Sequence, residues 1–312
     1  MKLSTNFPDE FFLAEGRTIK ISEDRKRLWA VQLDLLIEFD RVCRENGIKY
    51  SLDAGTLLGA IRHRGFIPWD DDIDVVMLRE EYEKLNSIAS EKFSYPYFWQ
   101  TCSTDPDHGR GFARLRNSST TYILKSELDG MRPIFSHNQG VFIDVFIFDR
   151  VPGNDEERAR FMDGMAKKQS YIWQMRMQKA VKLSWKRFLH PFVLGRKIKY
   201  FMYYNVLHVD IVSKIRKQLD LIAQRYSGGD GELVSRLTFK ADRHDRLSSC
   251  VPRHFLEELT SVEFEGYKFE ATKYWEEYLK IFYGDWHKHV IAHDPMGDAF
   301  IDLNNSYVTY LR

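Results

Sequence analysis

The sequence is poor in cysteine and has no long apolar run. Its three cysteines, Cys43, Cys102 and Cys250, show no Cys-X-X-Cys or Cys/His spacing. We therefore expect reduced thiols rather than a zinc or disulfide framework. No segment reaches the roughly 18 apolar residues of a membrane-spanning helix, and the N-terminus lacks a basic-then-apolar signal pattern. These absences predict a cytoplasmic protein.

An excess of charge of one sign is also missing. The chain has 46 Lys and Arg against 45 Asp and Glu, which gives a net charge of +1. This balance excludes a uniformly basic nucleic-acid binder, and no nucleic-acid partner is expected. Of the 312 residues 44% are hydrophobic, which predicts a folded globular protein with a substantial core.

The charge is distributed unevenly along the chain. Residues 167–217 contain 13 Lys and Arg but a single acid, Asp210, with Trp173 and Trp185 among them. Three interpretations remain open: a helical face that contacts an anionic membrane surface, a track for an anionic acceptor chain, or a solvated face balanced by acids elsewhere. The first would place the protein peripherally at the inner face of a membrane.

Hydrophobic periodicity predicts helices interleaved with strands in the first half of the chain. We expect helices over 23–46, 55–62, 80–91 and 273–283, and strands over 48–52, 73–77, 95–101, 111–115 and 141–148. From about residue 155 the pattern becomes helical. The fold class is therefore α/β or α+β.

An acidic motif follows the second helix. Asp72 and Asp74 stand two residues apart where a strand begins, so their side chains are expected on one face. Two carboxylates this close remain ionised most readily when they share a cation, for which Mg²⁺, or Mn²⁺ in its place, is suited. Asp144, in an otherwise apolar strand, is the expected third ligand; an ion pair with an arginine is its alternative.

Residues suited to nucleotide phosphates lie near these acids. Gly55 and Thr56 open a helix and offer free backbone N–H groups and a hydroxyl to a phosphate. Further candidates for the nucleotide site are Arg62, His63, Arg114, Arg116 and Trp69. Arg62 and His63 could instead belong to a solvated basic turn, and Arg114 and Arg116 could be a pair on the surface. Trp69 could simply be part of the hydrophobic core. Together with the acids they suit metal-assisted phosphoryl transfer.

The run GTLLGAIRHRGFIPWDDDID over residues 55–74 resembles the signature of the LicD family of phosphotransferases. These are relatives of fukutin and fukutin-related protein within the nucleotidyltransferase (polymerase β-like) superfamily. Weaker similarity continues over 112–121, 141–148 and 264–286. The resemblance implies a polymerase β-like core with a mixed sheet over 20–150, a basic helical region over 151–227 and a C-terminal block over 228–312 that packs on the core.

The resemblance also implies an activity. It is the Mg²⁺-dependent transfer of a substituted phosphate, most often phosphocholine from CDP-choline, to a hydroxyl of a cell-surface glycan or its lipid-linked precursor. Asp72, Asp74 and Asp144 then correspond to the metal-binding and catalytic acids, with Asp144 as the favoured base, and Gly55 and Thr56 hold the nucleotide phosphates.

Aromatic residues expected to enclose choline are Tyr122, Tyr283 and Trp286. Two alternatives to phosphocholine transfer stay open. One is a nucleotidyltransferase that moves NMP to a sugar phosphate or protein and releases pyrophosphate. The other is an inactive glycan-binding scaffold, which the presence of the three acids disfavours.

Overall fold

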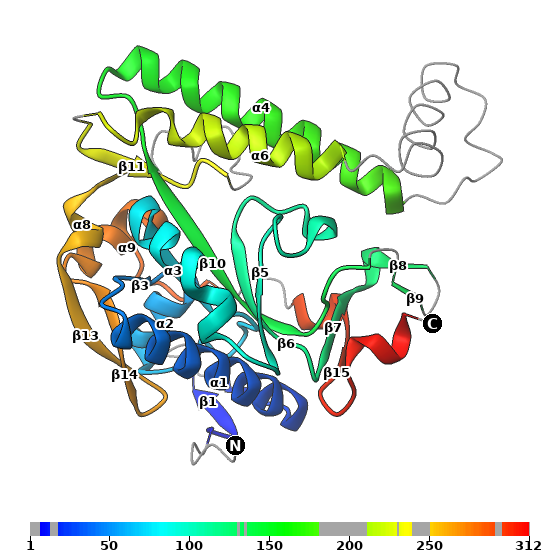
Figure 1. Cartoon of the computed structure of the whole chain (residues 1–312). Coiled ribbons are helices and arrows are strands. Elements are labelled where there is room, and N and C mark those ends of the chain that lie inside the picture. The colour runs from blue at the N-terminus through cyan, green and yellow to red at the C-terminus, as the bar shows by residue number, and fades with distance from the viewer. Residues whose placement is uncertain are drawn as a thin grey trace.

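The computed structural model of the chain describes residues 7–12, 18–129, 132–133, 136–180, 211–229, 231–238, 250–290 and 295–311. Helices and a curled mixed sheet alternate in its first half, which confirms the predicted mixture of α and β structure (Figure 1).

The central sheet is built around one long strand, β10. Its strand order is β12-β11-β10-β4-β3, with β6 also paired to β10 and β5 paired to β6. The strands are β3 (Ser51–Leu52), β4 (Asp74–Leu78), β5 (Tyr97–Gln100), β6 (Ala113–Asn117), β10 (Val141–Arg150), β11 (Leu233–Ser235) and β12 (Val251–Pro252). β10 and β4 run parallel, and the other pairs are antiparallel.

The register of this sheet brings charged residues together. Asp144 of β10 lies opposite Asp74 of β4 on one side and Arg114 of β6 on the other. Directly opposed residues share a face, so these three side chains lie on the same side of the sheet. β10 is otherwise almost wholly buried, as expected for a strand covered on both faces.

Three helices of the core match the predicted positions closely. They are α1 (Glu23–Glu45), α2 (Ala54–His63) and α3 (Arg79–Lys92). α1 begins after Ser22, whose hydroxyl accepts from the N–H of Arg25, and the chain turns at Gly47, where φ is +62°. α1 and α3 pack on β10, whereas α2 packs on β4 (Figure 1).

The helical region packs beside the sheet and has a buried cluster of its own. α4 (Asp155–Ala180) and α6 (Ile211–Ala223) run side by side and enclose a second cluster of buried side chains that includes Met165 and Leu219 (Figure 1). Residues 181–210 of the basic segment lie outside the described residues. Among the described helices, none is long and apolar enough to cross a membrane.

The C-terminal part returns to the core. It contains α8 (His254–Glu257), the hairpin β13 (Leu259–Phe264) and β14 (Tyr267–Thr272), and α9 (Trp275–Tyr283). The helix predicted at 273–283 is therefore confirmed. The hairpin is tied to the end of α2, because the N–H of Glu265 donates to the carbonyl of Arg64 at 2.7 Å and the N–H of Phe66 to the Glu265 carboxylate at 2.9 Å.

Smaller elements complete the described structure. The paired strands are β1 (Glu10–Phe12) with β2 (Thr18–Lys20), β7 (Thr121–Leu124) with β15 (Ala299–Asp302), and β8 (Leu128–Asp129) with β9 (Arg132–Pro133). The short 3-10 helices are η1 (Pro106–His108), η2 (Lys125–Glu127), η5 (Gln224–Tyr226), η6 (Pro295–Asp298) and η7 (Tyr307–Tyr310).

Candidate active site

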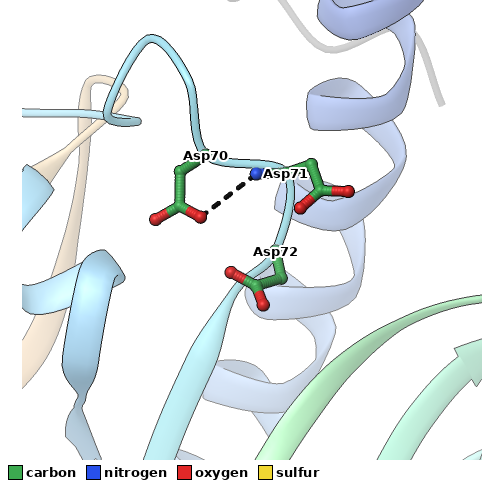
Figure 2. A group of neighbouring side chains, drawn as sticks. All are labelled: Asp70, Asp71 and Asp72. Carbon is green, nitrogen blue, oxygen red and sulfur yellow. Dashed lines mark hydrogen bonds between the residues drawn. The ribbon is translucent and has the colours of Figure 1, made fainter. Parts of the chain in front are cut away.

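Three consecutive carboxylates converge just before strand β4. Asp70, Asp71 and Asp72 each contribute an oxygen atom to a group in which all three atoms lie within 4.8 Å of one another (Figure 2). The N–H of Asp71 donates to the Asp70 carboxylate at 3.2 Å. Asp74 then begins β4 beside Asp144. The predicted acids therefore gather at one end of β4, together with a neighbour, Asp70, that the prediction left out.

Helix α1 fixes the backbone of this acidic loop. Arg25 Nη1 and Trp29 Nε1 both donate to the carbonyl of Asp70, at 2.9 and 3.0 Å. Gln32 Nε2 donates to the carbonyl of Asp71 at 2.6 Å. Because these donors come from one buried helix face, the backbone that carries the carboxylates is fixed before any ligand binds.

The first turn of α2 lies against the same carboxylates. A Cβ atom at Gly55 would come within 2.2 Å of Asp70 Oδ2, so only glycine lets this carboxylate approach the helix so closely. The Thr56 hydroxyl accepts from the backbone N–H of Asp74 at 2.8 Å. Gly55 and Thr56 thus position acids in the structure; their contact with nucleotide phosphates stays a prediction.

Asp53 caps α2 and connects it to the C-terminal part of the chain. Its Oδ1 atom accepts from the N–H of Ala54 at 2.8 Å and from the hydroxyl of Tyr278 at 2.7 Å. Arg236 Nη1 lies 3.3 Å from Asp53 Oδ2, and its guanidinium lies 5.0–5.6 Å from the ring centres of three phenylalanines, Phe146, Phe148 and Phe282. A cation from beyond residue 230 thereby reaches the start of α2.

Crowding of these acids changes their acidity. Burial raises the pKa of Asp72 well above its usual range, and the charges of Asp74 and Asp70 add to the effect. Burial also raises the pKa of Asp74, reinforced by Asp144 and Asp53 and opposed by Arg236. Such a cluster is stable at neutral pH when a cation neutralises it.

A divalent cation fits the donor atoms that are present. Asp74 Oδ1 is buried and accepts no hydrogen bond from any residue that the structure describes. Asp70 and Asp72 belong to the cluster whose carboxylate oxygens lie within 4.8 Å of one another, their charges act on Asp74, and hard carboxylate oxygens are what Mg²⁺ prefers. Asp70, Asp72 and Asp74 are therefore the residues that could hold it.

Asp144 is already engaged by an arginine. Arg114 Nε donates to Asp144 Oδ1 at 2.5 Å and Nη2 donates to Oδ2 at 3.3 Å. The ion pair considered as the alternative for Asp144 is thus present. It fixes the orientation of this carboxylate beside Asp74 and leaves its role as metal ligand or base a prediction.

Arg114 and Arg116 share one face of β6, as their spacing predicted. Their guanidinium groups lie 3.4 and 4.9 Å from the ring centre of Phe142. Arg116 is only 2% exposed, and it donates to the Gln100 side chain and to the carbonyl of Gly140. Because it is bound within the interior, this geometry favours a structural role for Arg116 over contact with a diphosphate.

The basic turn after α2 contacts the C-terminal part. Arg62 donates to the carbonyls of Trp286 and Lys288, at 3.2 and 3.3 Å. His63 packs between Phe11 and His289, and burial lowers its pKa to about 4. Trp69 is 9% exposed and has its ring edge-on to His289. These three candidates for the nucleotide site hold the chain segment after α9.

The aromatic candidates for choline differ in their surroundings. Tyr283 is 41% exposed, and burial of its hydroxyl together with the charges of Asp53, Asp74 and Asp70 raises its pKa. Tyr122 instead donates to Asp71 Oδ2 at 2.8 Å. The Trp286 ring stacks on His287 and meets Trp275 edge-on.

Sequence reasoning missed Asp53, Asp70, Tyr278 and Arg236. A signal exists for Asp53, because aspartate directly before a helix is a common N-cap. The run of three aspartates was itself a signal for Asp70. Nothing in the local sequence marks Tyr278 or Arg236, whose contacts with Asp53 span 225 and 183 positions of the chain.

The part of the chain that contains these acids is similar to a known protein family. The family model described as "LicD/FKTN/FKRP, nucleotidyltransferase domain" matches residues 47–193, which include α2, β4 and the acids. An uncharacterised protein of Rickettsia prowazekii is 35% identical over 78 residues, 22% of this chain and 29% of that protein.

A longer match covers most of the chain. The chain is 28% identical over 261 residues to the lipopolysaccharide cholinephosphotransferase LicD of Haemophilus influenzae. The matched residues make up 83% of this chain and 89% of that protein. Residues 47–193 therefore carry the domain of the LicD family, and most of the chain is similar to a LicD protein.

Proposed function

We propose that this enzyme is a LicD-type phosphotransferase that moves phosphocholine from CDP-choline to a hydroxyl of a cell-surface glycan or its lipid-linked precursor, with Mg²⁺ as cofactor. The observation that carries the proposal is the cluster of Asp70, Asp71 and Asp72 at the first turn of α2, with Asp74 next to it. The relation to a lipopolysaccharide cholinephosphotransferase supports the transferred group and the glycan acceptor. The family relation also supports a nucleotidyltransferase arrangement of the core.

In this reaction the acceptor oxygen forms a bond to the phosphorus of phosphocholine as the bond from that phosphorus to the oxygen of CMP breaks. Mg²⁺, held by Asp70, Asp72 and Asp74, would neutralise the charge that develops on the diphosphate. Asp144, oriented by Arg114, is the residue that we propose to accept the proton of the attacking hydroxyl.

Tyr283 supplies an aromatic face for the choline group. Its hydroxyl lies within electrostatic reach of Asp53, Asp74 and Asp70, and a quaternary ammonium is bound through cation–π contacts because it has no hydrogen to donate. The neighbouring carboxylates add electrostatic attraction for the same cation.

The basic segment over 167–217 supports a location at an anionic membrane surface, on the cytoplasmic side. A lipid-linked acceptor would be found there, and clustered Lys and Arg with Trp suit anionic headgroups.

The function is tested by analysing products. Purified protein is incubated with CDP-choline, lipopolysaccharide and Mg²⁺, and CMP, pyrophosphate and glycan-bound phosphocholine are measured. We expect CMP and phosphocholine-modified glycan, loss of both with EDTA, and a fall in kcat of at least about 100-fold in Asp72→Asn, because a metal ligand is removed.

Glu91→Gln, the same carboxylate-to-amide change on the exposed face of α3, is the matched control and should keep full activity. Release of pyrophosphate from CTP with a sugar phosphate, but no CMP from CDP-choline, would replace the proposal with nucleotidyl transfer. Unchanged activity in Asp72→Asn would remove the acids from the reaction.

A further inference from the structure

We propose that a cavity between the core and the helical region binds a sugar unit of the acceptor glycan; this inference rests on the proposed function. The cavity has a volume of about 300 Å³ and lies between α3, the loop after β5 and helix α6. Ligand-binding pockets have volumes of about 300–1,000 Å³, so this one suits a small ligand. None of Asp70, Asp72 and Asp74 lines it.

The lining has the chemistry that recognises a sugar. Hydroxyl and amide groups come from three elements around the cavity, and two aromatic side chains border it. These residues are Asn86, Thr101, Ser103, Gln224, Tyr82 and Phe112. Each sugar hydroxyl both donates and accepts a hydrogen bond, which amide and hydroxyl side chains match, while the C–H faces of a sugar pack on aromatic rings.

Charged groups of both signs line the cavity: Glu83 and Asp220 are acidic, and Arg110, Arg216 and Lys217 are basic. Arg79 Nη1, behind the wall, lies 3.1 Å from Glu83 and 2.9 Å from Asp220. Arg216 Nε donates to the carbonyl of Gly109 at 2.9 Å. The two acids offset two of the three lining cations, so the cavity lacks the strong excess of positive charge that a nucleotide requires, which favours a neutral polyhydroxyl ligand.

One side chain links the cavity to the acids. Phe112 lines the cavity, and the guanidinium of Arg114 lies 5.8 Å from its ring centre. Arg114 in turn binds Asp144. Two buried side chains, Phe112 and Arg114, thus lie between the cavity and Asp144, so a single sugar in the cavity would not reach the acids and a longer glycan would have to pass around these side chains. A sugar bound here would position another unit of the same glycan at the acids.

The test fills the cavity from its exposed edge. Saturation-transfer NMR is recorded with glucose, galactose, N-acetylglucosamine and N-acetylgalactosamine on the wild type and on Ser103→Trp. Ser90→Trp, on the exposed face of α3 outside the cavity lining, is the matched control. We expect at least one sugar to bind to the wild type and to Ser90→Trp, and its affinity to fall at least 10-fold in Ser103→Trp.

Two further measurements separate this inference from the proposed function. CDP-choline binding should be unchanged in Ser103→Trp, and sugar binding should be unchanged in Asp72→Asn. Gln224→Trp, on the α6 side of the cavity, replaces Ser103→Trp if that variant does not fold. The inference would be overturned if none of the four sugars bound, if Ser103→Trp bound a sugar as tightly as the wild type, or if inorganic phosphate displaced the sugar. Failure of the wild type to bind CDP-choline would count only against the proposed function.

Discussion

Negative charge accumulates at the first turn of α2, where Asp53 caps the helix and the charges of Asp70, Asp72 and Asp74 act on one another. Two guanidinium groups offset part of it, because Arg236 pairs with Asp53 and Arg114 with Asp144. The pKa values of Asp72 and Asp74 are nevertheless raised. The remaining charge is what a divalent cation would balance, so the excess of carboxylates is itself an argument for a metal site.

His63 makes stability depend on pH. Burial, Arg62 and His289 lower its pKa to about 4, whereas an unfolded histidine titrates near 6.5. Between these values the unfolded chain binds the proton more tightly, so the free energy of unfolding should fall as the pH drops from 6.5 to 4.

The variant His63→Gln lacks this pH-dependent change in the free energy of unfolding. Urea unfolding at pH 7 and pH 4.5 should show the wild type losing about 1–3 kcal/mol more than the variant over that interval. Equal losses in the two proteins would show that His63 is accessible to protons in the folded state.

Site residues could be predicted where the local sequence alone indicates their chemistry. Asp72 and Asp74 could be chosen because a motif of closely spaced acids points to a cation. The burial of Arg116 could not be predicted, because an arginine that alternates with apolar residues on a strand can face either the solvent or the interior. Only the contacts with Gln100 and Gly140 across the sheet decide between them.

At the scale of elements, α2 contains two glycines with different constraints. A Cβ at Gly55 would meet a side-chain oxygen of Asp70 at 2.2 Å, whereas a Cβ at Gly59 would meet the backbone carbonyl of Gly65 at 2.4 Å. Gly55→Ala should therefore displace the carboxylate and leave the free energy of unfolding within about 1 kcal/mol of the wild type, while weakening Mg²⁺ binding about 10-fold or more.

Gly59→Ala should do the opposite. Its neighbour is backbone that cannot rotate away, so we expect a loss of about 1–3 kcal/mol in urea unfolding. Calorimetric titration with Mg²⁺ completes the comparison. Wild-type Mg²⁺ affinity in Gly55→Ala would contradict the role of Asp70 at this helix.

Arg236 connects the segment over 231–238 to the start of α2. Removing one partner of a buried ion pair leaves the other charge uncompensated, so Arg236→Gln should lower the free energy of unfolding by about 3–5 kcal/mol. Arg236→Lys keeps the charge and should lose less. Urea unfolding measures both, and Arg225→Gln on the exposed end of the helical region serves as control. Equal stability of Arg236→Gln and the control would show that the pair contributes nothing.

At the scale of the whole molecule, the helices and central strands of the first half were predictable because each has its own periodicity and stop signals. The β13–β14 hairpin and the β7–β15 pair were not, since their pairing partners are decided by packing rather than by local sequence. The division into a core over 20–150, a helical region over 151–227 and a block over 228–312 stays a prediction. Leu237, for example, packs with the helical cluster although its neighbour Arg236 contacts the core.

The central claim is that the acids at α2 bind a CDP-linked donor through Mg²⁺, and calorimetric titration tests it most directly. CDP-choline, CDP-ethanolamine, CDP-ribitol and CTP are titrated into the protein with Mg²⁺ and with EDTA. We expect CDP-choline to bind most tightly, EDTA to abolish binding and Asp72→Asn to do the same, while Glu91→Gln binds normally. Binding of CDP-choline that is equal with and without Mg²⁺, or no binding of any of the four nucleotides, would contradict this claim.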